Sequence, residues 1–293
     1  MDKLPSFLII GAMKSATSSL YDQLVRQPGI FMSTPKEPNF FSDDAVYANG
    51  MEWYRSLFAA AQEGDLIGEA STHYTKLPTY PDTVSRIAEH LGSPRLIYVM
   101  RHPVDRLISH YIHEWSQGVI RCDIDKALDR HPELIDYSRY TMQMQPFIDA
   151  FGRNSILPVF FDHIKRDPEC ELIRICEFIG YQGNPAWYTD LSPSNVSLQR
   201  VRRFPLYSLL VDSKPATWLR RKFIPKSWRD HIRHELTLKK RPELNAMSLD
   251  RLNTVFDQDL AILGQWLGTE LNCGNFTQAT AHQSLEWQRE VTV

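Results

Sequence analysis

The sequence has few cysteines, and none of them lies in a metal-binding or redox spacing. Its 293 residues include four, at Cys122, Cys170, Cys176 and Cys273. No two form a C-x2-C pair, and none stands in a Cys/His cluster with zinc-ligand spacing. The pattern disfavours a structural metal site and a disulfide framework. We therefore expect reduced thiols and no bound metal.

Long hydrophobic runs and a strong charge excess are also missing. No run approaches the roughly 18 apolar residues of a membrane span, and the first residues lack the basic start and apolar stretch of a signal peptide. We therefore expect a cytoplasmic protein. The formal net charge of −2 disfavours a general nucleic-acid binder, which usually carries a basic excess over its whole domain. Any anion must be bound by a local group of residues.

Short apolar runs alternate with segments of helical periodicity. The runs predict buried strands at 6–10, 65–69, 95–100 and 155–161, and the intervening segments predict helices at 17–27, 51–61, 80–91 and 103–117. This alternation predicts an α/β fold with a parallel sheet covered by helices on both faces. No Gly- or Ser-rich linker marks a second domain. We expect one domain over 1–273, helical at its C-terminal part with a helix at 248–268, and a partly disordered tail over 274–293.

The segment "FLIIGAMKSATSSLY", residues 7–21, predicts a strand, a tight turn and the start of a helix. Such a turn places unpaired backbone N–H groups and the positive end of the helix dipole at one point, which binds phosphate-like groups well. Lys14 adds a charge, and Thr17, Ser18 and Ser19 add hydroxyl groups. An ordinary strand–helix turn with a solvated lysine remains an alternative from this stretch alone.

The segment differs from the ATP-binding P-loop, whose pattern is G-x-x-x-x-G-K-[ST]. Here Lys14 precedes the hydroxylated residues. The run at 95–100 is followed by Arg101, where a Walker-B-type strand would offer an aspartate to magnesium. Because an arginine attracts anions and repels a divalent cation, the sequence predicts a phosphate-binding fold that works without magnesium. A surface ion pair of Arg101, for instance with Asp105, is the alternative.

Four motifs in order, "GAMKSATSSLY", "KEPNFF", "GEASTHY" and "RLIYVMRHPVDRLISHY", resemble those of the sulfotransferases that use 3′-phosphoadenosine 5′-phosphosulfate (PAPS). The closer resemblance is to the heparan sulfate and other carbohydrate sulfotransferases. It covers about residues 6–181, with a weaker similarity at 248–268. The resemblance implies a P-loop-like three-layer fold.

The resemblance also assigns roles to individual residues. The loop that holds the 5′-phosphosulfate corresponds to Lys14, Ser15, Ala16, Thr17, Ser18 and Ser19. The pair that binds the 3′-phosphate corresponds to Arg101 and Ser109. Glu37 corresponds to the base of the carbohydrate branch, which removes the acceptor's hydroxyl proton. Lys14 would stabilise the charge that grows on the leaving oxygen, and His73 is the next candidate for the base.

Downstream basic residues are further candidates. A loop that covers the donor in relatives corresponds to Asn195, Ser197, Arg202 and Arg203. The basic segment 220–241 would face an anionic acceptor or an acidic membrane surface. A solvated basic helix face is the alternative interpretation of that segment.

Two positions depart from the family pattern. Ala16 stands where many relatives have glycine, so we expect the turn to avoid a positive φ there. Ala70 stands where some glycosaminoglycan enzymes have a lysine, which weakens the expectation of the same polysaccharide substrate. Glu69 and His73 are expected near the acceptor side, although a helix cap or a hydrogen-bonded buried histidine would explain them as well.

The function implied is transfer of a sulfuryl group from PAPS to a hydroxyl or amino group of a carbohydrate, glycolipid or similar acceptor, leaving adenosine 3′,5′-bisphosphate. A P-loop phosphotransferase and a non-catalytic nucleotide-binding relative are the alternatives. No nucleic-acid partner and no transmembrane segment are expected, while a peripheral membrane contact stays open. The sequence gives neither the acceptor nor the oligomeric state.

Overall fold

The computed structural model describes residues 3–191 and 240–288. The strands are β1 (Phe7–Gly11), β2 (Ile30–Met32), β3 (Leu66–Ala70), β4 (Arg95–Met100) and β5 (Ile156–Phe160). The first helices are α1 (Thr17–Val25), α2 (Asp44–Tyr47), α3 (Gly50–Ser56), the 3₁₀ turn η1 (Thr72–Thr75), α4 (Thr83–Leu91) and α5 (Pro103–Ser116). The later ones are α6 (Ile124–Arg130), α7 (Glu133–Asp136), α8 (Tyr140–Phe151), the 3₁₀ turn η2 (Arg153–Ser155), α9 (Phe161–Arg166), α10 (Pro168–Ile179), α13 (Ala246–Leu267) and α14 (Phe276–Ala281).

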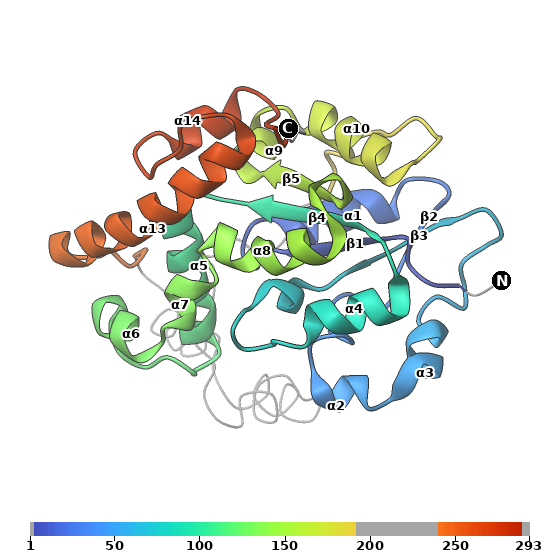
Figure 1. Cartoon of the computed structure of the whole chain (residues 1–293), viewed down its shortest axis with the longest axis horizontal. Coiled ribbons are helices and arrows are strands. Elements are labelled where there is room, and N and C mark those ends of the chain that lie inside the picture. The colour runs from blue at the N-terminus through green and yellow to red at the C-terminus, as the bar shows by residue number, and fades with distance from the viewer. Residues whose placement is uncertain (1–2, 192–239, 289–293) are drawn as a thin grey trace, which may run out of the picture.

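The five strands form one parallel sheet in the order β2-β3-β1-β4-β5 (Figure 1). β1 is central, pairing with β3 on one side and β4 on the other. The chain reaches β2 and β3 on one side of β1 and then crosses to β4 and β5 on the other. Ligands in open α/β sheets bind beyond the carboxyl ends of the strands at such a reversal of strand order.

Successive residues of the strands point to opposite faces of the sheet, and each face has its own core. Leu8, Tyr98 and Met100 face the helices α3, α4, α8, α13 and α14. Phe7, Ile97 and Val99 face α1, α9 and α10. Helices therefore cover both faces, which confirms the predicted α/β class and the three-layer arrangement.

The expected strands are all present, and the helices expected at 17–27, 51–61, 80–91 and 103–117 overlap α1, α3, α4 and α5. The 12-residue helices α8 and α10 were not predicted. The expected strand at 95–100 matches β4, and the other three expected strands are within one residue of β1, β3 and β5 at each end. The helix expected at 248–268 is α13. β2 was not predicted, because three residues, Ile30–Met32, are too few to show a period.

Part of the expected C-terminal tail packs into the core. Phe276 in α14 is fully buried and Leu285 is 5% exposed, while the Trp287 indole N–H donates to the Ile156 carbonyl of β5. Residues 276–287 therefore belong to the packed structure, which corrects the expectation of disorder for this stretch. The domain boundary itself stays a prediction.

Some predictions concern residues that the structure does not describe. Asn195, Ser197, Arg202, Arg203 and most of the basic segment 220–241 lie outside the described residues. Within 3–191 and 240–288, no helix combines the length and apolar character needed to cross a bilayer. The cytoplasmic location stays a prediction.

Phe276→Ala should lower the free energy of unfolding by about 3 to 5 kcal/mol, because it removes a fully buried ring and leaves a cavity. Chemical denaturation of the full chain measures this. Met247→Ala, at a side chain that is 83% exposed, should change stability by no more than about 0.5 kcal/mol. An equally small effect at Phe276 would contradict the packing of α14 described above.

Candidate anion-binding active site

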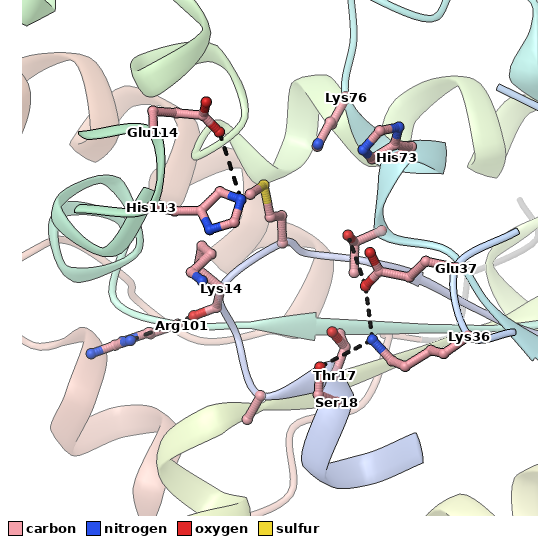
Figure 2. Close-up of a pocket in the computed structure, with 13 residues that line it drawn as sticks. Lys14, Thr17, Ser18, Lys36, Glu37, His73, Lys76, Arg101, His113 and Glu114 are labelled. Carbon is pink, nitrogen blue, oxygen red and sulfur yellow. Dashed lines mark hydrogen bonds and ion pairs between the residues drawn. The ribbon is translucent and has the colours of Figure 1, made fainter. Parts of the chain in front are cut away.

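A cavity of about 480 Å³ lies beyond the carboxyl ends of the strands. Its walls come from the loop after β1 with the start of α1, the loop after β2, the η1 region after β3, Arg101 just after β4, and α5 (Figure 2). Its lining residues are Met13, Lys14, Ala16, Thr17, Ser18, Lys36, Glu37, Thr72, His73, Lys76, Arg101, His113 and Glu114. The parallel sheet thus brings together candidates that are far apart in the sequence.

The turn after β1 adopts a conformation that the sequence analysis did not expect. Ala16 has φ 69°, in the left-handed region, and Lys14 has φ 74°. The expectation that Ala16 avoids a positive φ was therefore wrong. A left-handed residue turns neighbouring N–H groups toward one point, forming an anion-binding concavity. No side chain caps the N-terminus of α1, so its first N–H groups are available to an anion.

The hydroxylated residues of this loop are not equivalent. Thr17 and Ser18, at the start of α1, line the cavity. Ser15 is fully buried, and its Oγ has no hydrogen-bond partner among the described residues. Ser19 lies in the first turn of α1 and is not part of the cavity wall in this structure.

Arg101, immediately after β4, reaches the cavity as predicted. One terminal nitrogen donates to the Lys14 carbonyl at 3.4 Å, and the guanidinium lies 4.8 Å from the centroid of the Phe161 ring. Its Nε is buried without a hydrogen-bond partner in the described part of the chain. Asp105, the suggested surface partner, instead forms an ion pair with Arg241. Arg101 is therefore available to an anion.

Ser109, the other residue assigned to the 3′-phosphate, occupies a different position. It is 5% exposed on α5, one helical turn before His113. Within the described residues it does not line the cavity. Of this predicted pair, the structure brings only Arg101 to the cavity wall.

Glu37 lies in the loop after β2 in a left-handed conformation with φ 58°. Its backbone N–H donates to the Ala70 carbonyl at 3.0 Å. Lys36 Nζ and Thr72 Oγ1 both donate to Glu37 Oε1, at 2.7 and 3.4 Å. Burial alone would raise the pKa of this carboxyl, but the Lys36 charge and hydrogen bond, with His73 and Lys76, hold it below its ordinary value. Glu37 is therefore a carboxylate at neutral pH.

Lys36 connects Glu37 to the start of α1. Its Nζ also donates to Ser18 Oγ at 3.0 Å (Figure 2). The sequence analysis did not single out this lysine, although it precedes Glu37 directly in "KEPNFF". One ammonium group thus contacts both the base candidate and the N-terminal turn of α1.

Glu69 is a core residue and does not reach the cavity. It is fully buried and accepts hydrogen bonds from Ser71 Oγ at 2.5 Å, from Tyr74 Oη at 2.7 Å and from Tyr54 Oη. Burial raises its pKa, and the three hydroxyl donors partly offset that rise. Ala70 beside it is also fully buried. The expectation that Glu69 lies near the acceptor side was therefore wrong.

His73 does line the cavity. Its ring stacks on Tyr80 with centroids 5.1 Å apart, and its Nδ1 is buried without a hydrogen-bond partner among the residues described. Burial, helped by the Lys76 charge, lowers the pKa of His73 to about 4. The imidazole is therefore neutral near pH 7.

Five other polar or charged groups at or near this wall were not predicted from the sequence. They are Lys36, Thr72, Lys76, His113 and Glu114. His113 and Glu114 follow Ser109 by four and five residues, so a helical projection of 103–117 would have placed them near Ser109. Among the described residues that line the cavity there are four cations, Lys14, Lys36, Lys76 and Arg101, and two carboxylates, Glu37 and Glu114. The site attracts anions.

Comparisons with known proteins find similar sequences among sulfotransferases. The model of the Sulfotransferase family matches residues 54–185. Heparan sulfate glucosamine 3-O-sulfotransferase 3A1 of Mus musculus is 30% identical over 190 residues, covering 61% of this chain and 46% of that protein. Membrane-associated sulfotransferase kil1 of Dictyostelium discoideum is 38% identical over 111 residues, covering 37% of this chain and 22% of that protein. The chain thus spans less than half the length of these relatives.

A solved structure matches nearly the whole chain. A sulfotransferase from Alicyclobacillus acidocaldarius superposes with a TM-score of 0.63 at 22% identity, covering 92% of this chain and 98% of that one. This likeness concerns the fold. In sequence, the chain is similar to the sulfotransferase family over residues 54–185, and heparan sulfate sulfotransferases are among the proteins that it resembles.

Proposed function

We propose that this protein transfers a sulfuryl group from PAPS to a hydroxyl or amino group of a carbohydrate or a similar acceptor. One observation carries the proposal: the cation-lined cavity holds both an uncapped helix N-terminus and an ionised glutamate. The first suits the anionic donor, and the second suits removal of a proton from the acceptor. The named activities of the relatives in the sulfotransferase family support the same reaction.

The described residues fit a donor with separate anionic groups. The N-terminus of α1 and the left-handed Lys14 and Ala16 suit the 5′-phosphosulfate. Arg101, whose Nε lacks a partner within the described chain, suits the 3′-phosphate, since a guanidinium can form two parallel hydrogen bonds to a phosphate. When bound, PAPS supplies the sulfuryl group. Lys14 would stabilise negative charge on the oxygen that it leaves.

Glu37 is the proposed base. Both of its side-chain hydrogen bonds from described residues go to Oε1, so Oε2 is left to accept the acceptor's proton. Lys36 keeps the carboxylate ionised and fixes its direction, since its ammonium also contacts Ser18. A positioned carboxylate of this kind contributes roughly 10²- to 10⁴-fold to a rate.

The acceptor class is proposed from the relatives. Two of them are named heparan sulfate glucosamine 3-O-sulfotransferase and heparan sulfate N-deacetylase/N-sulfotransferase, so both hydroxyl and amino groups of a sugar are proposed here. Ala70 and Glu69 are fully buried and do not line the cavity, so they offer the acceptor neither a cation nor a free carboxylate. The acceptor therefore need not be the same polysaccharide.

Adenosine 3′,5′-bisphosphate should raise the melting temperature of the protein without added Mg²⁺, because a ligand that binds only the folded state stabilises it by mass action. AMP, which lacks the 3′-phosphate, should have a much smaller effect. Differential scanning fluorimetry with and without EDTA measures both. A strict need for Mg²⁺, with preference for ATP, would instead support the phosphotransferase alternative.

Glu37→Gln should reduce turnover with PAPS by roughly 10²-fold or more while leaving the affinity for adenosine 3′,5′-bisphosphate nearly unchanged. Glu52→Gln, at an exposed glutamate of α3, is the matched control and should keep full activity. Because the pKa of Glu37 is held below its ordinary value, wild-type activity governed by this group should persist at neutral pH and fall only as the pH drops through that lowered pKa. A near wild-type rate in Glu37→Gln would shift the base assignment to another group.

Arg101→Ala should weaken binding of adenosine 3′,5′-bisphosphate by about 2 to 4 kcal/mol, since charge-assisted hydrogen bonds are lost. Adenosine 5′-phosphosulfate lacks the 3′-phosphate, so its weaker binding should barely change. Calorimetry with both nucleotides tests this, and Arg251→Ala, at an exposed arginine paired with Asp129, is the control. An equal loss for the two nucleotides would mean that Arg101 supports the loop and does not contact the 3′-phosphate.

A further inference from the structure

Lys76 is a buried cation without a counterion. Its residue is 8% exposed and lines the cavity, yet its ammonium has no hydrogen bond or ion pair among the described residues. Its Nζ lies 5.8 Å from the centroid of the Tyr137 ring. Burial lowers the pKa of Lys76 to about 8. The folded protein thus carries the desolvation cost of an ammonium that no carboxylate of the described residues contacts directly.

The two carboxylates near Lys76 contact other residues and form no ion pair with its ammonium. Glu37 is bonded to Lys36, and the Glu114 carboxylate lies 3.5 Å from His110 and 3.9 Å from His113. Both carboxylates raise the pKa of Lys76 at a distance, while Arg106 lowers it. The other titratable groups on this side are His73, His110 and Tyr137. His73, neutral near pH 7, also has an unpartnered buried Nδ1.

The position of Lys76 separates it from the proposed donor contacts. In Figure 2, Lys76 and His73 lie on one side of Glu37, and Lys36 with Thr17 and Ser18 lies on the other. The donor loop and Arg101 already provide the groups for a phosphosulfate and a second phosphate. Lys76, on the far side of Glu37, is therefore not needed for the proposed contacts to PAPS.

We propose that Lys76, with the neighbouring His73, forms an anion subsite that binds a carboxylate or sulfate group of the acceptor, so that the protein selects anionic over neutral acceptors. This inference rests on the proposed function. An anion bound there would stabilise the buried ammonium of Lys76. It would also place the acceptor's reacting group beside Glu37. Lys76 lies two residues after the motif "GEASTHY", and Ala70 within that motif supplies no charge.

The test uses two acceptors that differ in charge alone. One is an oligosaccharide of alternating glucuronate and N-acetylglucosamine, and the other is its carboxyl methyl ester, which keeps every hydroxyl group. Full-length protein saturated with adenosine 3′,5′-bisphosphate is titrated with each by calorimetry, and transfer from PAPS is measured in parallel. Wild type should prefer the acid by roughly tenfold to a hundredfold, the range for a hydrogen bond between charged groups.

Lys76→Met should remove this preference by weakening the acid and leaving the ester unchanged, and Lys76→Arg should keep most of it. Lys126→Met, at an exposed lysine of α6, is the matched control. Because the ammonium of Lys76 loses its proton above about pH 8, the preference should decline there in wild type. Lys76→Met should not lower the melting temperature, since it removes a buried charge that has no partner.

Equal use of acid and ester by wild type, or an unchanged preference in Lys76→Met, would overturn the proposal while leaving the sulfotransferase assignment intact. A loss of nucleotide affinity in Lys76→Met would also overturn it, by placing Lys76 on a donor phosphate. Failure of the proposed function looks different, because then neither nucleotide stabilisation nor transfer to any acceptor would be seen in wild type.

Discussion

The site depends on holding several cations close together with too few carboxylates to balance them. Lys14, Lys36, Lys76 and Arg101 come from four separate segments, and each follows a different strand of one parallel sheet. Two like charges 8 Å apart repel by about 2 kcal/mol at an effective dielectric constant of 20. The fold tolerates this repulsion because packing on both faces of the sheet fixes the strand ends. An anion that enters the cavity relieves it, so the free protein already favours anionic ligands.

Glu37 and Glu69 show how environment gives two carboxyl groups opposite pKa shifts. Glu69 lies in β3 inside the core, where burial raises its pKa and hydroxyl groups of Ser71, Tyr54 and Tyr74 donate to its oxygens. Glu37 lies in the cavity, where an ammonium lowers its pKa. Glu69 therefore holds the loop after β3 in place. Glu37 remains the group that can exchange a proton with a ligand.

The sequence allowed the fold class and most strands to be predicted, because buried parallel strands read as apolar runs and the helices between them keep their own period. Lys14, Glu37 and Arg101 were also predicted, since each stands in a recognisable motif. Ser109 shows the limit of that approach: a motif gives spacing along a helix but not the rotation of that helix toward the cavity. Lys76 lies in no motif, and its importance comes from burial without a partner, which only the three-dimensional structure reveals.

The loop that contains Ala16 is contacted from behind by a buried cation. A left-handed alanine costs about 1 to 2 kcal/mol and persists only where its surroundings determine it. Arg106 of α5 is fully buried and donates to the Met13 carbonyl at 3.5 Å and to the Leu134 carbonyl at 2.9 Å, with Ser138 as a further partner. Burial lowers its pKa to about 10, so it is still a cation at neutral pH. Arg106 thus holds the loop after β1 in place by its hydrogen bond to the Met13 carbonyl. Its positive charge also favours an anion at the N-terminus of α1.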